Sequence, residues 1–454
     1  MPSTRLARGP SAATAATTGA TVLISATPAG LPGEAYSVSP SISADGRYVA
    51  FHSQATDLIA DDNNGDPDVF IHDRLTGETE LVSVASSGEQ ADNYSANGVI
   101  SPDGRYVVFE SKAGNIDPVN IYPLFNIYIR DRQAGTTTVI ALSPAGLPPN
   151  QETRNPDISA DGRYVVYVSA ASNLVPADDN NASDIFLHDR QTGSTGLISS
   201  ALSGGIANGD STDPRLSSNG RYIVYSSSAN DLTPGDQNSA NDVFLHDRQM
   251  GTTRLLSVSM NGEQGNANSE ATAIAPGGRF VVFSSIASNL TPGDTNGVAD
   301  YFVVDLLTGA LERISVSSSG EQGNAAVTSG ASISADGRFV TFASSASNLV
   351  PGDTNQATDV FVRDRLADTT TRISVDSAGA QAIGYSQEPV ISADGSFVAF
   401  HSNAGNLFPG DNNYANDIFV HDRRAESTYS AAGRITDAGG APMSGLAVCT
   451  QDNQ

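Results

Sequence analysis

A repeat of about 58 residues constrains the fold of this chain more than any other feature of its sequence. The string Ile-Ser-Ala-Asp-Gly-Arg-Tyr-Val begins at position 42. Related strings begin at Ile100, Ile158, Leu216, Ile274, Ile333 and Ile391, so that consecutive copies lie 58 or 59 residues apart. Seven copies in phase indicate one structural unit repeated seven times, in which each unit packs against its neighbours.

Each copy contains four short stretches that are typical of β-strands. In the first copy, an apolar stretch that ends at Ile42 precedes a turn at Asp45-Gly46 and an alternating segment, 47–53. A polar loop leads to residues 68–73, and a turn at 75–77 opens the fourth stretch, 79–84. Alternation with tight turns, and without a helical period, indicates antiparallel strands. The sequence therefore predicts an all-β fold, a seven-bladed β-propeller of four-stranded antiparallel blades.

The N-terminal segment indicates how the ring closes. The string Pro28-Ala-Gly-Leu-Pro32 recurs two repeats later as Pro144-Ala-Gly-Leu-Pro148, which places residues 21–25 in the phase of a fourth strand. The seventh copy lacks apolar residues at its own fourth strand. We therefore expect the N-terminal strand to pair with the seventh blade, whose edge would otherwise stay unpaired.

The two ends of the chain lie outside the repeats. Residues 1–19 are rich in Ala, Ser and Thr, and we expect them to form a disordered leader; they contain no apolar run typical of a secretion signal. The predicted propeller covers residues 20–428. In residues 429–454, the string Gly433-Arg-Ile-Thr-Asp-Ala-Gly-Gly-Ala-Pro-Met443 resembles the first hairpin of a carboxypeptidase-regulatory-like domain. This resemblance implies the truncated start of a β-sandwich domain.

Composition narrows the range of partners. The chain has 50 acidic and 24 basic residues, for a net charge of −26. Nucleic-acid affinity comes mainly from Lys and Arg beside phosphates, so we do not expect this chain, whose only lysine is Lys112, to bind nucleic acid. It has no run of 18 apolar residues, so we expect no membrane span. We expect a monomer.

The repeat resembles a known family. The pattern Pro-x-Ile-Ser-x-Asp-Gly-Arg-Tyr-Val-x-Phe-x-Ser, followed by Asp-Val-Phe-Val-x-Asp-Arg, is similar to the TolB-like, WD-like propeller repeats of bacteria over residues 20–423. This resemblance implies a β-propeller that serves as a protein-binding scaffold, a transport-system component or an accessory domain of a hydrolase. It also favours an extracellular or periplasmic location, but no signal peptide is visible and the compartment stays open.

The acidic loop ahead of the third strand is the main candidate site. Six of the seven copies carry the pattern Asp-x-Asn-x-x-x-Asp in this loop. The six sets are Asp62, Asn64 and Asp68; Asp178, Asn180 and Asp184; Asp236, Asn238 and Asp242; Asp294, Asn296 and Asp300; Asp353, Asn355 and Asp359; and Asp411, Asn413 and Asp417. Oxygen ligands at alternate positions of a tight turn suit Ca²⁺. Asp and Asn also form Asx-turns through their own side chains, so a structural role is the alternative. The second copy has Asn120, Tyr122 and Asn126 in these places, and we expect no site there.

A recurrent Arg and a recurrent Asp should form a structural ion pair. An Arg opens the second strand of six copies, at positions 47, 105, 163, 221, 279 and 338, and an Asp ends the third strand of all seven. In an antiparallel hairpin the start of one strand faces the end of the next, so the two side chains should meet. Ser396 replaces the Arg in the seventh copy.

The histidines argue against a catalytic site. His52 and His401 share one repeat position, and the other four share a second, namely His72, His188, His246 and His421. A catalytic base belongs to one asymmetric site, whereas these residues are spread around a ring. The chain also lacks Gly-x-Ser-x-Gly, His-Glu-x-x-His and Cys-x-x-Cys motifs. The sequence therefore predicts a non-catalytic scaffold that binds a protein or a glycan on its long-loop face. The alternatives are the accessory propeller of a larger hydrolase and a periplasmic TolB-type transport component.

Overall fold

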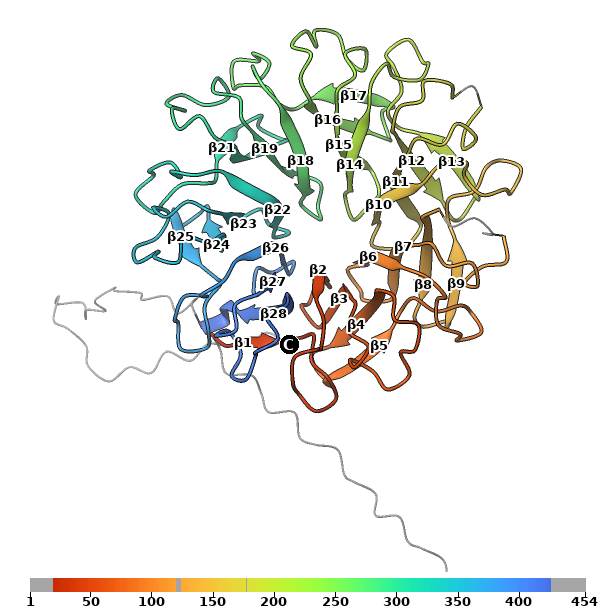
Figure 1. Cartoon of the computed structure of the whole chain (residues 1–454). Coiled ribbons are helices and arrows are strands. Elements are labelled where there is room, and N and C mark those ends of the chain that lie inside the picture. Colours follow the sequence, from red (N-terminus) through yellow and green to blue (C-terminus); the bar gives the residue numbers. More distant parts are fainter. Residues whose placement is uncertain (1–18, 120–123, 177, 426–454) are drawn as a thin grey trace, which may run out of the picture.

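The computed structural model describes residues 19–119, 124–176 and 178–425 and consists of strands arranged in a ring (Figure 1). Each of the seven blades is a four-stranded antiparallel sheet whose strands follow one another from the axis outward. Blades 1 to 3 comprise β2 (Ser37–Ile42), β3 (Tyr48–Ser53), β4 (Asp68–Asp73) and β5 (Glu78–Leu81); β6 (Ser95–Ile100), β7 (Tyr106–Ser111), β8 (Asn126–Asp131) and β9 (Thr136–Val139); and β10 (Thr153–Ile158), β11 (Tyr164–Ser169), β12 (Asp184–Asp189) and β13 (Ser194–Leu197). Blades 4 and 5 comprise β14 (Ser211–Leu216), β15 (Tyr222–Ser227), β16 (Asp242–Asp247) and β17 (Thr252–Leu255); and β18 (Ser269–Ile274), β19 (Phe280–Ser285), β20 (Asp300–Asp305) and β21 (Leu311–Arg313). Blade 6 comprises β22 (Val327–Ile333), β23 (Phe339–Ser344), β24 (Asp359–Asp364) and β25 (Thr369–Arg372). The predicted fold class is confirmed.

The seventh blade is completed by the N-terminal strand, as the sequence predicts. Its strands are β26 (Ser386–Ile391), β27 (Phe397–Ser402), β28 (Asp417–Asp422) and, outermost, β1 (Thr21–Leu23). The registers of β1 and β28 pair Thr21 with His421 and Leu23 with Phe419. In Figure 1, β1 from the red end of the chain lies beside the blue β28. Pairing therefore satisfies the edge of β28 with residues from the opposite end of the chain.

The hydrophobic core is divided into seams between adjacent blades. Ile71 of blade 1, for example, packs in one buried cluster with Val107 and Phe109 of blade 2. The seam between blades 7 and 1 is filled in the same way, with Phe51 against Ile418. Because each blade buries its apolar faces only against its neighbours, the blades stabilise one another and the ring provides a rigid frame.

The Asp-Gly turn of each repeat is a packing contact between blades. Gly46 has a φ of +71°, and a Cβ added to it would lie 2.2 Å from Cδ2 of Phe397 in blade 7. Gly104 of blade 2 likewise has a φ of +74°, and a Cβ added to it would lie 2.4 Å from Cδ2 of Tyr48 in blade 1. Only glycine provides both the left-handed backbone and the space for the neighbouring ring. The repeated Asp-Gly-Arg-Tyr string therefore forms a turn and also provides the glycine and the aromatic ring that pack against each other between adjacent blades.

The fourth strand ends earlier than the sequence pattern suggests. In blade 1 it ends at Leu81 instead of Val84. Val82 still donates its N–H to the carbonyl of Val69, but the next side chain, Ser83, turns toward Asp68 and the link to blade 2 begins. Among the described residues, no helix is long and apolar enough to cross a membrane.

Candidate functional site

The acidic loops and the links between blades share one face of the ring, which we call the acidic face. It consists of the loop between the second and third strand of each blade, residues 54–67 in blade 1, and of the link to the next blade, residues 82–94. Contacts between loop and link hold the two together, since Asn64 Nδ2 donates to the carbonyl of Ala91 at 2.8 Å. The Asp-Gly turns lie at the other ends of the strands.

The last Asp of each acidic loop is a buried anchor at the start of the third strand. Asp68 is 0% exposed, and its Oδ1 accepts a hydrogen bond of 2.5 Å from Ser83 Oγ. The same Ser–Asp bond recurs in the other five blades that carry the pattern, at 2.5–2.6 Å. Burial raises the pKa of Asp68 and Asp184 to about 6 and that of Asp417 to about 7. These carboxyls are therefore held in an environment that disfavours their charge.

The Asn in the middle of each loop forms an Asx-turn and a bridge. Asn64 Oδ1 accepts the N–H of Asp66 at 2.9 Å, and its Nδ2 donates to Asp68 Oδ2 at 2.8 Å. Asn180 and Asn413 make the corresponding bonds in their own loops. The amide thus orients the carboxylate of the last Asp and closes the turn, as the structural interpretation of the pattern requires.

The first and last Asp of each loop form a carboxylate pair, and in four blades a side-chain donor lies between them. In blade 1, Gln90 Nε2 lies 2.7 Å from Asp62 Oδ1 and 2.8 Å from Asp68 Oδ2. Gln264 and Gln381 make the same two contacts in blades 4 and 6. In blade 5 the guanidinium of Arg313 takes this role, 3.2 Å from Asp294 and 3.6 Å from Asp300.

Sequence reasoning missed these donors. The signal was present as a Gln repeated in the links, in Gly-Glu-Gln at 88–90 and 262–264 and in Gly-Ala-Gln at 379–381, but its partner lies 22 residues earlier, across a complete hairpin. The carboxylate pairs of blades 3 and 7 have no such donor among the described residues, because Ile206 and Pro32 occupy the equivalent position. Blade 2 has Asn126 in place of the last Asp; residues 120–123 lie outside the described part of the chain.

The expected Arg–Asp pairs form in all six blades that carry the Arg. Arg163 donates from Nε and Nη2 to the two carboxylate oxygens of Asp189, at 2.9 and 2.7 Å. These bonds hold the pKa of Asp189 at about 2. In blade 7, where Ser396 replaces the Arg, Asp422 pairs with Arg424 instead. These pairs lie away from the acidic face and stiffen the turns.

Four of the histidines bond to the neighbouring strand. His72 Nδ1 lies 3.0 Å from Thr79 Oγ1 on β5, and His188 and His246 repeat this contact. His421 makes it with Thr21 of β1, at 2.9 Å. Each of these side chains joins the third strand to the fourth.

The two inner strands of blades 1 and 7 carry a second polar cluster, which consists of His52 on β3, His401 on β27 and Glu388 on β26. His52 and His401 are 6% and 5% exposed, and burial lowers the pKa of His52 to about 4. His401 Nδ1 lies 3.5 Å from Glu388, whose φ of +50° marks a bulge in β26. Within the described residues, however, no three His, Cys, Asp or Glu side chains converge in a group that could hold a metal ion.

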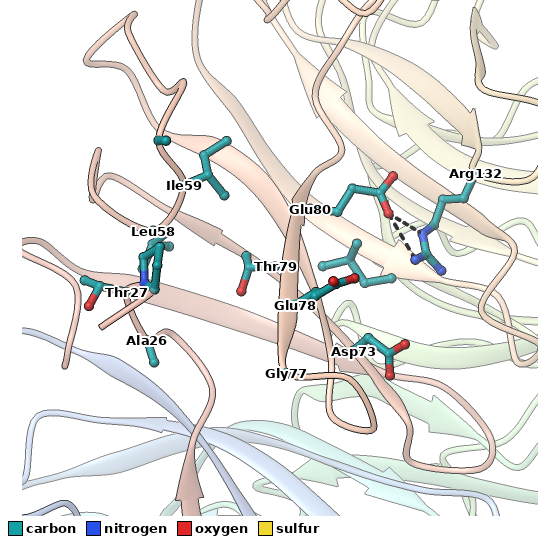
Figure 2. Close-up of a pocket in the computed structure, with 13 residues that line it drawn as sticks. Ala26, Thr27, Leu58, Ile59, Asp73, Gly77, Glu78, Thr79, Glu80 and Arg132 are labelled. Atoms are coloured by element: carbon teal, nitrogen blue, oxygen red, sulfur yellow. Dashed lines mark hydrogen bonds and ion pairs between the residues drawn. The ribbon is translucent and has the colours of Figure 1, made fainter. Parts of the chain in front are cut away.

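A pocket lies at the outer side of blade 1 (Figure 2). It has a volume of about 630 Å³ and lies between the link that carries Thr27, the loop at Leu58 and β5. At one wall, Arg132 of blade 2 donates to Glu80 Oε2 at 3.1 and 3.3 Å, as Figure 2 shows. The polar side chains of its lining are two threonines, Thr27 and Thr79, three carboxylates, Asp73, Glu78 and Glu80, and Arg132.

Comparison with known proteins defines the fold but not the activity. No protein-family model matches the chain, and a search of curated proteins found no match. Among solved structures, the chain is similar to the β-propeller domain of the Trilobed protease from Pyrococcus furiosus, with 12% identity, a TM-score of 0.53, and coverage of 86% of this chain and 95% of that one. It is also similar to an oligogalacturonate lyase in complex with manganese, with 13% identity, a TM-score of 0.53, and coverage of 90% and 94%. TolB from Acinetobacter baumannii matches with 15% identity and a TM-score of 0.38 over 84% of this chain and 81% of that one.

The protein is thus a seven-bladed β-propeller, the fold that the resemblance to TolB-like repeats implies. Solved propellers with TM-scores above 0.5 to this chain include a domain of a protease and a lyase, and at 12–13% identity this likeness shows the fold alone.

Proposed function

We propose that this propeller is a non-catalytic scaffold that binds a protein or a glycan on its acidic face. The observation that carries this proposal is the regularity of that face. Six loops of nearly the same structure, each anchored by a buried Asp, are presented side by side on a rigid ring. Long loops on a rigid frame are where binding residues usually lie.

The distribution of the polar groups supports binding over catalysis. Four histidines are engaged with threonines of their own blade, and the other two are buried. A repeated, acidic surface favours partners with cationic or polyhydroxyl groups, since such partners complement charge and hydrogen-bond acceptors together.

The test uses charge reversal on each face. The protein is applied to arrays of oligosaccharides and of basic peptides, and the probe that binds is titrated against variants. Glu263→Lys combined with Glu321→Lys changes two exposed residues in the links of the acidic face. We expect this double variant to weaken binding at least about tenfold, because a reversed charge repels a cationic partner.

The matched control is Glu78→Lys, an exposed residue beside the turn on the opposite face. It should bind like the unchanged protein. Loss of binding in Glu78→Lys with full binding in the double variant would place the partner on the other face. Absence of binding to every probe would count against the scaffold proposal.

The runner-up is the propeller of a larger hydrolase. The likeness to the propeller domain of a protease supports this alternative at the level of fold. It would be favoured if the complete gene encoded a domain with a nucleophile–His–acid triad, and further adhesive or sandwich domains would favour the scaffold.

A further inference from the structure

The carboxylate pairs of blades 3 and 7 lack a donor between the two carboxylates, whereas each of the other four pairs has one, a Gln or an Arg. In blade 5 the donor is Arg313 at the end of β21, whereas in blades 1, 4 and 6 it comes from the link, at a position that bridges back across a small hairpin, as Gln90 does with Val84. Ile206 occupies this position in blade 3, and Pro32 occupies it in blade 7. Neither side chain has a hydrogen-bond donor.

An unpartnered carboxylate oxygen is buried at each of these two places. Asp178 is 7% exposed and Asp411 is 6% exposed. The Oδ2 atom of each is closed to solvent and has no hydrogen-bond partner. A buried carboxylate without a compensating donor or cation is strongly disfavoured.

Asp178 and Asp411, each with its Oδ2 atom unpartnered, lie close enough to the second carboxyl of their pair to influence its charge. The negative charge of Asp178 contributes to the raised pKa of Asp184, and that of Asp411 contributes to the raised pKa of Asp417, both after the larger effect of burial. The second carboxyl is itself held in place, since Asp417 accepts bonds from Ser25 Oγ at 2.6 Å and Asn413 Nδ2 at 3.1 Å. Two fixed acidic groups thus meet in a space that a cation would neutralise.

In blade 1 the space between the two carboxylates is occupied by a side-chain nitrogen, and its distances to their oxygens are close to those of a bound Ca²⁺ ion. Gln90 Nε2 lies 2.7 and 2.8 Å from one oxygen of each carboxylate. Ca²⁺ binds oxygen at about 2.3–2.6 Å, so an ion in the place of this nitrogen needs only a small approach of the two carboxylates. Ca²⁺ also tolerates irregular ligand sets completed by backbone oxygens and water, whereas Mg²⁺ requires near-octahedral geometry.

We propose that blades 3 and 7 each bind one Ca²⁺ ion, between Asp178 and Asp184 and between Asp411 and Asp417, and that the other four loops bind none. In those four loops the amide of Gln90, Gln264 or Gln381, or the guanidinium of Arg313, occupies the place of the ion. The Asp-x-Asn-x-x-x-Asp pattern is the same in all six loops, so the selectivity comes from the donor that reaches the pair, a link Gln in three blades and Arg313 of β21 in blade 5. This proposal is independent of the proposed scaffold function.

The first test is the stoichiometry of Ca²⁺ binding. The complete chain, freed of metal with EDTA, is titrated with Ca²⁺ by calorimetry in about 0.1 M KCl, which screens weak association with surface charge beyond ~10 Å. We expect two saturable sites per chain. No saturable binding, or any stoichiometry other than two, overturns the proposal.

The second test fills the two places with the side chain that the other blades use. Ile206→Gln should remove one site and Pro32→Gln the other, and the double variant should bind no Ca²⁺. The matched controls are Leu202→Gln and Leu31→Gln, which make similar changes at exposed positions of the same two links. Both controls should keep two sites.

The variants should fold, because the new amide supplies a donor to the Oδ2 atom of Asp178 or Asp411, which otherwise has no hydrogen-bond partner. In EDTA, Ile206→Gln should melt at or above the temperature of the unchanged protein. Should either variant fail to fold, Asp178→Asn and Asp411→Asn replace it, each with the loss of one site expected. Two sites that persist in the double variant, or in the paired Asp→Asn variants, overturn the proposal.

Discussion

Ser25 Oγ donates a hydrogen bond of 2.6 Å to Asp417 Oδ1, although the two residues lie 392 positions apart. In blade 1 the same bond joins Ser83 to Asp68, which are only 15 positions apart. The N-terminal segment therefore supplies blade 7 with both its outer strand and the buried serine that anchors the acidic loop. The segment that closes the ring therefore also anchors the seventh acidic loop.

Deletion of residues 1–27 should open the ring. The truncated protein loses the pairing of β1 with β28 and leaves Asp417 buried without its serine. We expect aggregation or a large fall in Tm, because an unpaired strand edge recruits other chains and an unsatisfied buried group is costly. Deletion of residues 1–18 is the control and should leave Tm unchanged. Thermal unfolding and light scattering distinguish the outcomes, and similar melting of both truncations would refute closure by β1.

Gly46→Ala should be more destabilising than Gly77→Ala. Both glycines have a left-handed φ, +71° and +75°, which costs a residue with a Cβ about 1–2 kcal/mol. Of the two, only Gly46 also lies against a ring: a Cβ added to it would lie 2.2 Å from Cδ2 of Phe397. Such overpacking adds a further loss of about 1–3 kcal/mol in stability. Gly77 has no atom within 4 Å of its added Cβ and is the matched control. Urea unfolding measures the stability of both variants. Equal losses of stability would show that the contact of Gly46 with the ring of Phe397 does not contribute.

Asp417 should make stability depend on pH between about 4 and 7. Burial raises its pKa to about 7 in the folded chain, against about 3.9 in the unfolded chain. Between these values the folded chain keeps a proton that the unfolded chain has released, so this group's contribution to stability falls as the pH rises through the window. Asp417→Asn removes the titration, and in EDTA the variant should gain Tm relative to the unchanged protein between pH 5 and pH 8.

Two features make the pH comparison specific. The buried histidines, whose pKa values are lowered, act in the opposite direction but are present in both proteins and cancel. Asp189→Asn is the control, because the pKa of Asp189 is about 2 and lies below the tested range. A constant difference in Tm between Asp417→Asn and the unchanged protein from pH 5 to pH 8 would contradict the assignment.

The spacing of the repeat was enough to predict the blades, their number and the role of the N-terminal strand. The phase of residues 21–25 defined the closing strand because a fixed period places every segment in a known position of the unit. The Arg–Asp pairs, such as Arg163 with Asp189, were predictable for the same reason, since hairpin register brings strand ends together.

The partners of the acidic loops were not predictable in this way. Gln90 reaches Asp62 from a link whose path depends on how the chain turns after β5, and that turn depends on the bond from Ser83 to Asp68. Glu388 lies close to His401 through a bulge in β26, which shifts the register by an amount that alternation does not encode. The repeat period predicts where a residue lies within a blade. The contacts of Gln90 with Asp62 and of Glu388 with His401 depend in addition on the path of a link and on a β-bulge, which the period does not specify.

Gln90→Ile should convert the loop of blade 1 into one that resembles blade 3. The variant loses the two hydrogen bonds from Nε2, at 2.7 and 2.8 Å, so Asp62 loses this donor while Asp68 keeps its bonds from Asn64 and Ser83. In EDTA we expect the free energy of unfolding to fall by about 1–3 kcal/mol, the cost of an unsatisfied buried acceptor.

Added Ca²⁺ should then stabilise the Gln90→Ile variant more than the unchanged protein, because a third ion binds only to the folded state. Calorimetry should show three sites per chain. Gln54→Ile, at the exposed first position of the same loop, is the control and should keep two sites and the original stability. Equal instability of Gln90→Ile with and without Ca²⁺ would show that the space between the carboxylates does not accept the ion.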